Sequence, residues 1–302
     1  NRSLSAPLSI WGDHTDTFAE RDGGMIQFYA EDVQEAMDNI LMAYKVAEDR
    51  DILLPALSCL HGFILTHVQE PVELHDQEKV DQFLPDRVPE YTLDPSDPVT
   101  MGAYARPEHW TETRYMIHKA SLRSKDKIGE AVEEFADLFD REYGLEYNGL
   151  VDTYRADDAD VILVALGSVC GTIRYVVDEY REKGEKVGLV RPRVYRPFPS
   201  EQMRKALSGA KSVAVLEKDI SVGYEGALAT DLKSALYSSN INIPLMNFIV
   251  GLAGRDVSKD NLRKIVEKTK DAAGKEPSEI SPSDEENWEP LYTELLPEEV
   301  DY

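Results

Sequence analysis

The sequence predicts an α/β protein in which helices cover parallel sheets, and three observations support this prediction. Short apolar runs of strand length alternate with amphipathic stretches of helical period. The second half repeats this alternation over about 110 residues, as a parallel α/β sheet requires. The chain has 302 residues, of which 42% are hydrophobic, so it is long enough for two domains with separate cores.

The first 70 residues or so predict two strand-to-helix steps. An apolar, partly aromatic run over 25–30 indicates a strand, and the acidic pair that follows suits a helix N-terminus. From Val33 the apolar residues recur at i, i+3, i+4 and i+7, which predicts a helix ending near Asp49. The run over 52–60 is almost wholly apolar and predicts a strand buried on both faces.

A proline-rich stretch separates the two halves. Because proline lacks the N–H and the dihedral freedom that regular elements need, we predict a domain boundary near residue 100. A long amphipathic helix is expected from about 108 to 142. The predicted divisions are therefore a first domain over 1–100 and a connecting helical segment over 101–150. The prolines of this stretch are Pro85, Pro89, Pro95, Pro98 and Pro107.

The segment 151–270 predicts a complete parallel α/β domain. Strands are expected over 161–166, 186–190, 212–216 and 245–250. Helices are expected after the glycine turns at 167–172 and 223–226, and after two serines that suit N-caps, Ser200 and Ser258. The acidic tail over 271–302 is expected to wrap a neighbour or to be mobile.

Charge and cysteine content exclude several classes of protein. The chain has 57 acidic and 33 basic residues, a formal charge of -24, and no basic stripe, so nucleic-acid binding is not expected. No apolar run of about 18 residues and no signal peptide appear, which indicates a cytoplasmic protein without membrane contact. Its two cysteines, Cys59 and Cys170, cannot build a disulfide framework or an iron–sulfur or zinc site, so any cluster must belong to a partner.

No self-sufficient catalytic site and no metal site is predicted. The glycine turn at 167–172 suits an anion or is only structural, and the similar turn at 251–256 is read as structural. The histidines lack the close spacing to carboxylates or thiolates that metal ligands show. Arg2 precedes an apolar stretch, and its guanidinium could grip a carboxylate by two hydrogen bonds; the alternative is an ordinary surface arginine.

Several long strings resemble one family, over about nine-tenths of the chain. They are similar to the alpha subunit of pyruvate:ferredoxin oxidoreductase and its 2-oxoacid relatives, in the split-subunit form of archaea and anaerobes. The strings include NRSLSAPLSIWGDHTDTFAERDGGMIQFYAEDVQEAMDNILMAYKVAED, LLPALSCLHGFILTHVQEPVEL, MGAYARPEHWTETRY, VAVLEKDISVGYEGAL and GLAGRDV.

This resemblance implies a fold and an activity. The fold would be part of a pyrimidine-type thiamine-diphosphate-binding domain, followed by a transketolase C-terminal-like α/β domain. The enzyme would decarboxylate a 2-oxoacid on thiamine diphosphate with Mg²⁺, pass electrons through [4Fe-4S] clusters to ferredoxin, and form acyl-coenzyme A reversibly. The other subunits (beta, gamma and delta) would supply the diphosphate–Mg²⁺ half and the clusters.

The resemblance also implies site residues. Arg2 matches the arginine that binds the substrate carboxylate, and the loop of Trp11, Gly12, Asp13 and His14 would lie near the mouth of the site. The family's glutamate that activates the aminopyrimidine has no counterpart here, so we expect the sequence to lack the N-terminal part of that domain. His61 stands where the family usually has aspartate, which indicates a change of substrate or of subunit contact.

Three alternatives remain at this level. Pyruvate is the expected substrate, but branched-chain 2-oxoacids, 2-oxoglutarate or oxalate are open, since pocket volume decides among them. The chain could instead be a structural or docking subunit without chemistry, as the missing glutamate suggests. Because the chain is so acidic, we expect an acidic ferredoxin to dock on another subunit.

Overall fold

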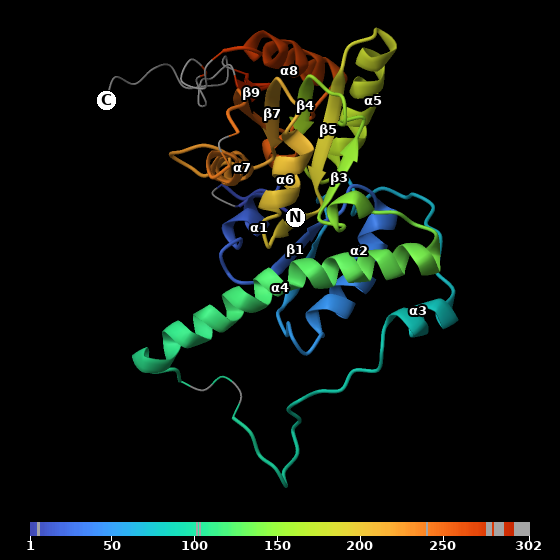
Figure 1. The fold of residues 1–302 in the computed structure, drawn as a ribbon, viewed down its shortest axis with the longest axis vertical. Coiled ribbons are helices and arrows are strands. Elements are labelled where there is room, and N and C mark those ends of the chain that lie inside the picture. Colours follow the sequence, from blue (N-terminus) through green and yellow to red (C-terminus); the bar gives the residue numbers. More distant parts are fainter. Residues whose placement is uncertain are drawn as a thin grey trace.

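The computed structural model describes residues 1–4, 7–100, 102, 104–239, 241–275, 280 and 287–292. Two sheets lie one above the other along the long axis of the molecule (Figure 1). The lower, three-stranded sheet has the order β2-β1-β6, and the upper, six-stranded sheet has the order β3-β5-β4-β7-β8-β9. The α/β fold predicted from the sequence is thereby confirmed.

The lower sheet joins both halves of the sequence. Strand β1 (Ile26–Tyr29) is parallel to β2 (Ala56–Cys59) and antiparallel to β6 (Val194–Arg196). Helix α2 (Val33–Ala47) packs against β2 and starts where Asp32 accepts a hydrogen bond from the Glu35 N–H, as an N-cap does. The short helices α1 (Thr15–Ala19) and α3 (Gln77–Phe83) complete this part. Because β6 comes from residue 194 onward, the chain returns to the first sheet after entering the second.

The upper sheet is parallel except at one edge. Strands β4 (Val161–Val164), β5 (Val187–Pro192), β7 (Ser212–Glu217) and β8 (Leu245–Val250) are parallel, and β3 (Val151–Tyr154) pairs antiparallel to β5. Two helices on one face are α5 (Val169–Glu182) and α8 (Lys259–Ala272). Their counterparts on the other face are α6 (Ser200–Leu207) and α7 (Ala227–Tyr237). Both faces are therefore covered, so strand residues such as Leu163 and Val215 are fully buried.

One long helix, α4 (Pro107–Phe139), crosses the lower sheet region (Figure 1). Its C-terminal half packs on α2 and buries Ile128, Val132 and Phe135, while most of its side chains before Ala120 are exposed. A 3₁₀ turn, Leu145–Tyr147, leads into β3. The helix expected over 108–142 is confirmed, whereas the division at residues 100 and 150 stays a prediction.

Three details differ from the sequence-based expectations. The strand expected over 52–60 is limited to β2, because residues before it form a turn in which Leu53 has φ 46°. Ser200 is the first residue of α6, and Pro199 holds the cap position, whereas Ser258 caps α8 as expected. In the tail, β9 (Trp288–Glu289) pairs parallel to β8 of the same chain. Residues 276–279, 281–286 and 293–302 lie outside the described residues, so the expectation that the tail wraps a neighbour or is mobile stays a prediction.

Candidate functional site

The carboxyl ends of strands from both sheets face one another at one junction. The loop after β2 contributes His61, and the turn after β4 contributes Ser168, whose hydroxyl lies 2.7 Å from the His61 Nδ1. A Cβ atom on Gly167 would lie 3.0 Å from the His14 ring, so the first loop of the chain also closes on this turn. Loops at the carboxyl ends of parallel strands are where α/β proteins place their ligands, which makes this junction the candidate site.

The N-terminal loop is fastened to the loop after β2. The Arg2 N–H donates to Asp16 at 2.8 Å, and the Ser3 N–H donates to the Trp11 carbonyl at 3.0 Å. A Cβ atom on Gly12 would lie 2.3 Å from the Gly62 carbonyl oxygen, so only glycine permits this approach. The Trp11 ring packs on Phe63 with centroids 4.8 Å apart. The two loops therefore form one unit.

Arg2 lies on this unit with its side chain exposed. A Cβ atom on Gly62 would lie 3.4 Å from the Arg2 Cγ, which places the stem of the side chain beside Gly62. The guanidinium makes no ion pair with any residue that the structure describes. In this chain alone the Arg2 side chain is open to solvent. For its guanidinium to face into a cleft, another polypeptide must cover it.

Asp13 and His14 are buried, each 2% exposed, and both link the loop to the upper sheet. Asp13 accepts hydrogen bonds from the Thr15 hydroxyl at 2.6 Å and from the Ala253 N–H, beyond β8, at 2.9 Å. The His14 N–H donates to the Lys218 carbonyl, just after β7, at 2.8 Å. Burial, with the nearby His61, lowers the pKa of His14 well below its usual value, so its ring is neutral.

His61 is the buried histidine whose second nitrogen has no partner. Its Nδ1 is engaged by Ser168, while its Nε2 has no hydrogen-bond partner among the described residues. Burial, together with the nearby Lys218 charge, lowers the pKa of His61 to about 4. The ring is therefore neutral, and its Nε2 is a polar atom available to a group bound between the loops.

Strand β7 ends at Glu217, and two further charged residues, Lys218 and Asp219, follow it at the same junction. Burial lowers the pKa of Lys218 to about 8, against the pull of Asp13 and Asp256. Burial and the neighbouring carboxyl of Asp219 raise the pKa of Glu217, which accepts hydrogen bonds from the Leu228 and Ala229 N–H groups at the start of α7. These two carboxyls hold a proton between them.

An open cavity of about 670 Å³ adjoins this cluster. It lies between the N-terminal loop, α1 and the loops that follow β7 and β8. Residues from each wall are Leu4, Thr15, Phe18, Asp219 and Ala253. A space of this size is within the range of small-molecule sites.

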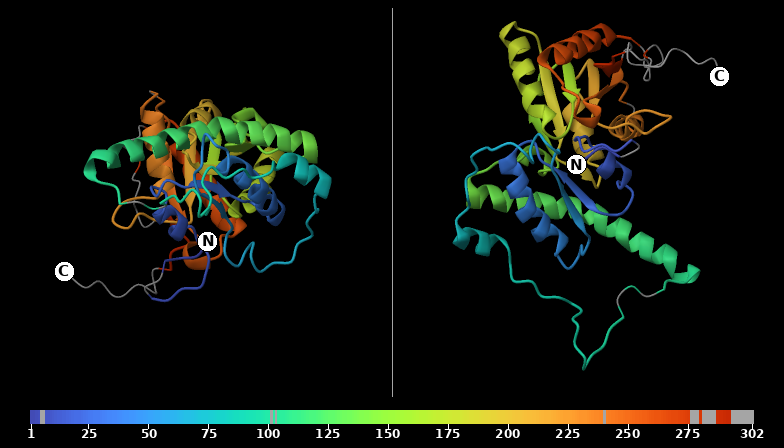
Figure 2. Two further views of the ribbon diagram at one scale, coloured as in Figure 1. Left: turned by 90° about the horizontal axis from the view of Figure 1, so that it is seen from below. Right: turned by 180° about the vertical axis from the view of Figure 1, so that it is seen from behind.

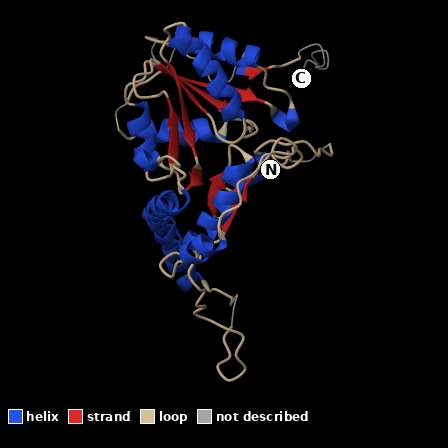
Figure 3. Ribbon diagram, turned by 90° about the vertical axis from the view of Figure 1, so that its right-hand side faces the viewer, coloured by secondary structure: helices blue, strands red, loops and turns tan. Residues whose placement is uncertain are grey.

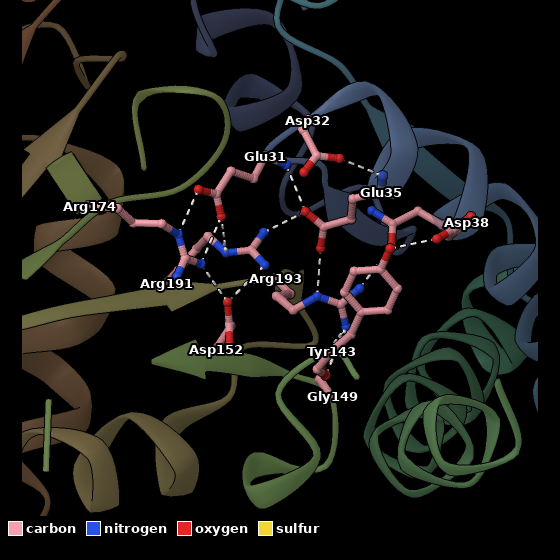
Figure 4. A network of polar contacts seen from close by, with 11 residues as sticks. Glu31, Asp32, Glu35, Asp38, Tyr143, Gly149, Asp152, Arg174, Arg191 and Arg193 are labelled. Atoms are coloured by element: carbon pink, nitrogen blue, oxygen red, sulfur yellow. Dashed lines mark hydrogen bonds and ion pairs between the residues drawn. The ribbon is translucent and has the colours of Figure 1, made fainter. Parts of the chain in front are cut away.

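A buried network of charges fixes the two sheets at this junction (Figure 4). Glu35, on α2, accepts hydrogen bonds from Arg191 and Arg193 of the β5–β6 segment at 2.6 Å each. Arg174, on α5, forms two hydrogen bonds with Glu31, just after β1. The carboxylates and guanidinium groups compensate one another, so these ions remain charged despite their burial.

The structure brings Arg2, Trp11, Gly12, Asp13 and His14 together, and their roles stay predictions. The sequence-based site did not include Lys218, and sequence reasoning singled out His61 and the 167–172 turn separately, without joining them to this loop. One signal for Lys218 was present, since the charged run Glu217-Lys218-Asp219 ends a fully apolar strand. The glycine turn at 167–172, considered as an anion site, has its serine engaged by His61 instead.

The described residues fit only part of the thiamine diphosphate that the resemblance implies. Within the described ranges, no three metal-ligating side chains converge, so this part of the chain offers no Mg²⁺ cage for a diphosphate. The buried, unpaired His61 Nε2 is a place where a bound group could make a hydrogen bond.

Among the described residues, none of the helices combines the length and the apolar character that a membrane span needs.

Two family models match the chain. Residues 1–133 match the thiamine-diphosphate-binding domain of pyruvate flavodoxin/ferredoxin oxidoreductases, and residues 159–262 match core domain II of pyruvate:ferredoxin oxidoreductase. These matches define the class as the thiamine-dependent oxidoreductases of 2-oxoacids.

Curated relatives place the chain within this class. It is 49% identical to the pyruvate synthase subunit PorA of Methanothermobacter thermautotrophicus, over 89% of this chain and 68% of that protein. It is 46% identical to PorA of Methanosarcina barkeri, over 90% and 67%. The ketoisovalerate oxidoreductase subunit VorA of Pyrococcus horikoshii is 41% identical over 89% and 67%. The chain therefore belongs to the pyruvate:ferredoxin oxidoreductase family, as an alpha subunit of the PorA type.

A solved structure shares the fold. The 2-oxoglutarate:ferredoxin oxidoreductase of Magnetococcus marinus aligns with a TM-score of 0.54 at 14% identity. The alignment covers 90% of this chain and 47% of that one, so our chain spans about half of it. At this identity the likeness supports the fold alone.

Proposed function

We propose that this chain is the alpha subunit of a cytoplasmic pyruvate synthase. The enzyme converts pyruvate and coenzyme A to acetyl-coenzyme A and CO₂, reversibly, and passes two electrons to ferredoxin. The observation that supports this proposal best is the 46–49% identity to PorA subunits, above the 41% to a VorA subunit. The loop that bears Arg2 and the 12–14 segment lies at the junction where a small acid would bind.

In this proposal Arg2 binds the substrate carboxylate. The guanidinium is exposed and unpaired within the described chain, so no internal carboxylate competes for it. A guanidinium grips a carboxylate through two parallel, charge-assisted hydrogen bonds, which fixes the orientation of the acid. This orientation matters because the bond to the carboxylate must be aligned with the electron sink before it breaks.

The proposal divides the cofactors among subunits. Thiamine diphosphate supplies the electron sink for decarboxylation. The loops at 12–14 and 61–63 would lie on its pyrimidine side and exclude water there, while the beta subunit would hold the diphosphate and Mg²⁺. The [4Fe-4S] clusters and the ferredoxin dock belong to the partner subunits, because two buried, separate cysteines cannot ligate a cluster.

The test is a kinetic comparison on the purified complex. Arg2→Ala should raise the KM for pyruvate by about 10- to 100-fold, since a charge-assisted hydrogen-bond pair is lost, and leave thiamine binding nearly intact. Arg50→Ala removes an exposed arginine elsewhere and is the matched control. An unchanged KM for the Arg2 variant would remove the proposed role.

A substrate panel on the same complex tests the reaction itself. Pyruvate should give the highest kcat/KM, ahead of 2-oxoisovalerate, 2-oxoglutarate and oxalate. A higher value for 2-oxoisovalerate would assign the complex to the branched-chain type. If all substrates fail while thiamine and clusters are present, the chain is a docking subunit instead.

A further inference from the structure

The open cavity of about 670 Å³ beside the N-terminal loop has no assigned role in the proposed function. The start of the chain lies where the two sheets meet, and the cavity lies beside it (Figures 2 and 3). Most of the cavity wall is apolar, so the hydrocarbon part of a small molecule could lie against it. The large apolar residues of the wall are Leu4, Leu8, Phe18, Ile220, Val222 and Leu252.

Two buried acidic residues, Asp13 and Asp219, line the same cavity and are 2% and 3% exposed. The Asp13 carboxylate is engaged, because it accepts hydrogen bonds from Thr15 and from the Ala253 N–H. The Asp219 carboxyl accepts no well-formed hydrogen bond from the described residues, and its polar neighbours are the Glu217 carboxyl and the Ala227 N–H. Asp219 is therefore a buried polar group on the cavity wall that a bound donor would satisfy.

The hydrogen bonds of Glu217 determine the charge of Asp219. Glu217 accepts hydrogen bonds from the Leu228 N–H, the Ala229 N–H and the Asn247 Nδ2 at 2.8, 2.9 and 2.9 Å. Three donors favour the ionised form of Glu217, so the proton that the two carboxyls share lies on Asp219. The member of the pair that lines the cavity is thus a neutral acid, which ionises when a positive group approaches it.

The cationic residue of the cavity wall, Arg21, is directed to other acceptors. Its Nη1 donates to the Phe18 carbonyl at 3.0 Å, and its Nε lies 3.9 Å from the exposed Asp22 carboxylate. Arg21 therefore acts on Asp219 without a hydrogen bond. Because Asp13 and the Glu217–Asp219 pair each carry one negative charge, negative charge exceeds positive charge at the cavity wall.

We propose that this cavity binds an apolar primary amine, whose ammonium group meets Asp219 while its hydrocarbon body lies on the apolar wall. On binding, the O–H bond of the Asp219 carboxyl breaks, its proton passes to solvent, and the ammonium donates to the carboxylate that remains. A neutral molecule of the same shape cannot make this exchange, and an acid is repelled by Asp13. The proposal goes beyond the proposed function, whose acid substrate carries the opposite charge.

The experiment is calorimetric titration of the assembled complex, saturated with thiamine diphosphate so that the cofactor is not the ligand measured. The probe is 2-phenylethylammonium, and 2-phenylethanol is the neutral control of similar shape. The ammonium should bind about tenfold more tightly than the alcohol, because only the ammonium forms a charge-assisted hydrogen bond. Titrations at pH 6 in phosphate and in PIPES should report the release of about one proton per bound ammonium. Equal affinities, or binding without proton release, would overturn the proposal.

Three variants locate the site. Asp219→Asn keeps a neutral, hydrogen-bonding side chain beside Glu217, so the melting temperature should match the wild type, while the preference for the ammonium and the proton release should both be lost. Leu8→Lys adds a positive charge to the wall at a residue that is 84% exposed, and should weaken ammonium binding about fivefold. Leu74→Lys makes the same change at a residue that is 79% exposed elsewhere, and should leave the affinity unchanged. Wild-type binding by Asp219→Asn, or equal effects of the two lysine variants, contradicts the assignment.

Discussion

Burial sets the pH range in which the His61 ring takes up a proton. Its pKa is about 4 in the folded chain, against about 6.5 in an unfolded one, so the unfolded state binds a proton first as the pH falls. Its contribution to stability is present above pH 6.5 and is lost as the pH falls toward 4. The shift corresponds to a contribution on the order of 3 kcal/mol.

We therefore predict that His61→Asn weakens the acid sensitivity of the protein. Asparagine can keep a hydrogen bond to Ser168 but does not titrate, so the free energy of unfolding should fall less steeply between pH 6.5 and 4. Urea denaturation at several pH values measures this slope. His118→Asn makes the same exchange on the exposed surface of α4 and is the control. Equal slopes for wild type and His61→Asn would contradict the assignment.

Lys218 gives a pH dependence of the same sign in a higher pH range. Burial lowers its pKa to about 8, below the unfolded value near 10.5, so its charged form destabilises the fold below pH 8. As the pH rises from 8 to 10.5, stability should increase in the wild type. Lys218→Met should raise the free energy of unfolding at pH 7, by an amount on the order of 3 kcal/mol, and remove this increase. Denaturation at pH 7 and pH 10 tests both, and a less stable variant at pH 7 would refute the prediction.

At the scale of single residues, sequence reasoning identified the N-terminal loop, His61 and the 167–172 turn, but not that they meet. Arg2 and the 11–14 segment stand together in the sequence, so one string identifies them. His61 and Ser168 are separated by 107 residues, and their contact depends on how the two sheets meet. No local pattern encodes that junction.

At the scale of secondary-structure elements, the most important contact joins α2 to the β5–β6 segment through Glu35. Burial alone would raise the pKa of Glu35, but Arg191 and Arg193 lower it to about 2. Its stabilising effect is thus present above the unfolded pKa near 4.5 and is lost as the pH falls toward 2. Glu35 is 2% exposed, so its loss leaves the buried Arg193 without a counter-charge, while Arg191 keeps Glu31 and Asp152.

Glu35→Gln should destabilise the protein by about 3–5 kcal/mol at pH 7, as removal of one partner of a buried ion pair does. Thermal and urea unfolding measure the change. Glu146→Gln removes one member of the exposed Lys205–Glu146 pair and should have a much smaller effect. A similar loss of unfolding free energy in both variants would show that the buried network contributes little to stability.

Elements with strong local signals were predictable, and those set by distant contacts were not. The strand β4 is a continuous apolar run, β7 is apolar over 213–216, β8 is interrupted only by Asn247, and Ser258 forms a capping box with Asn261, so local sequence identifies these elements. The pairing of β6 with β1 joins residues far apart in the chain, and it escaped prediction. The run over 52–60 looked like one strand because its apolar residues do not reveal the turn at Leu53.

At the scale of the whole molecule, the end of the described chain closes the upper sheet. Strand β9 pairs with β8, Glu289 accepts a hydrogen bond from Asn261 at 2.8 Å, and Arg255 donates to the Pro290 carbonyl. Deleting residues 276–302 should therefore lower stability by ~2 kcal/mol, since buried donors lose their acceptors. Deleting only 293–302 leaves β9 in place and is the control. Equal melting temperatures for the two deletions would show that β9 is not stabilising.

The hydrogen bonds of the Asp13 carboxylate and of the His14 backbone N–H have a mechanical consequence. They tie the loop that bears Arg2 to the ends of β7 and β8, while the Gly12–Gly62 contact ties the same loop to the lower sheet. Because this loop is held on both sides, any hinge motion between the two sheets must displace Arg2. In the proposed function, in which Arg2 binds the substrate carboxylate, a tilt of one half against the other would change how tightly the substrate is held.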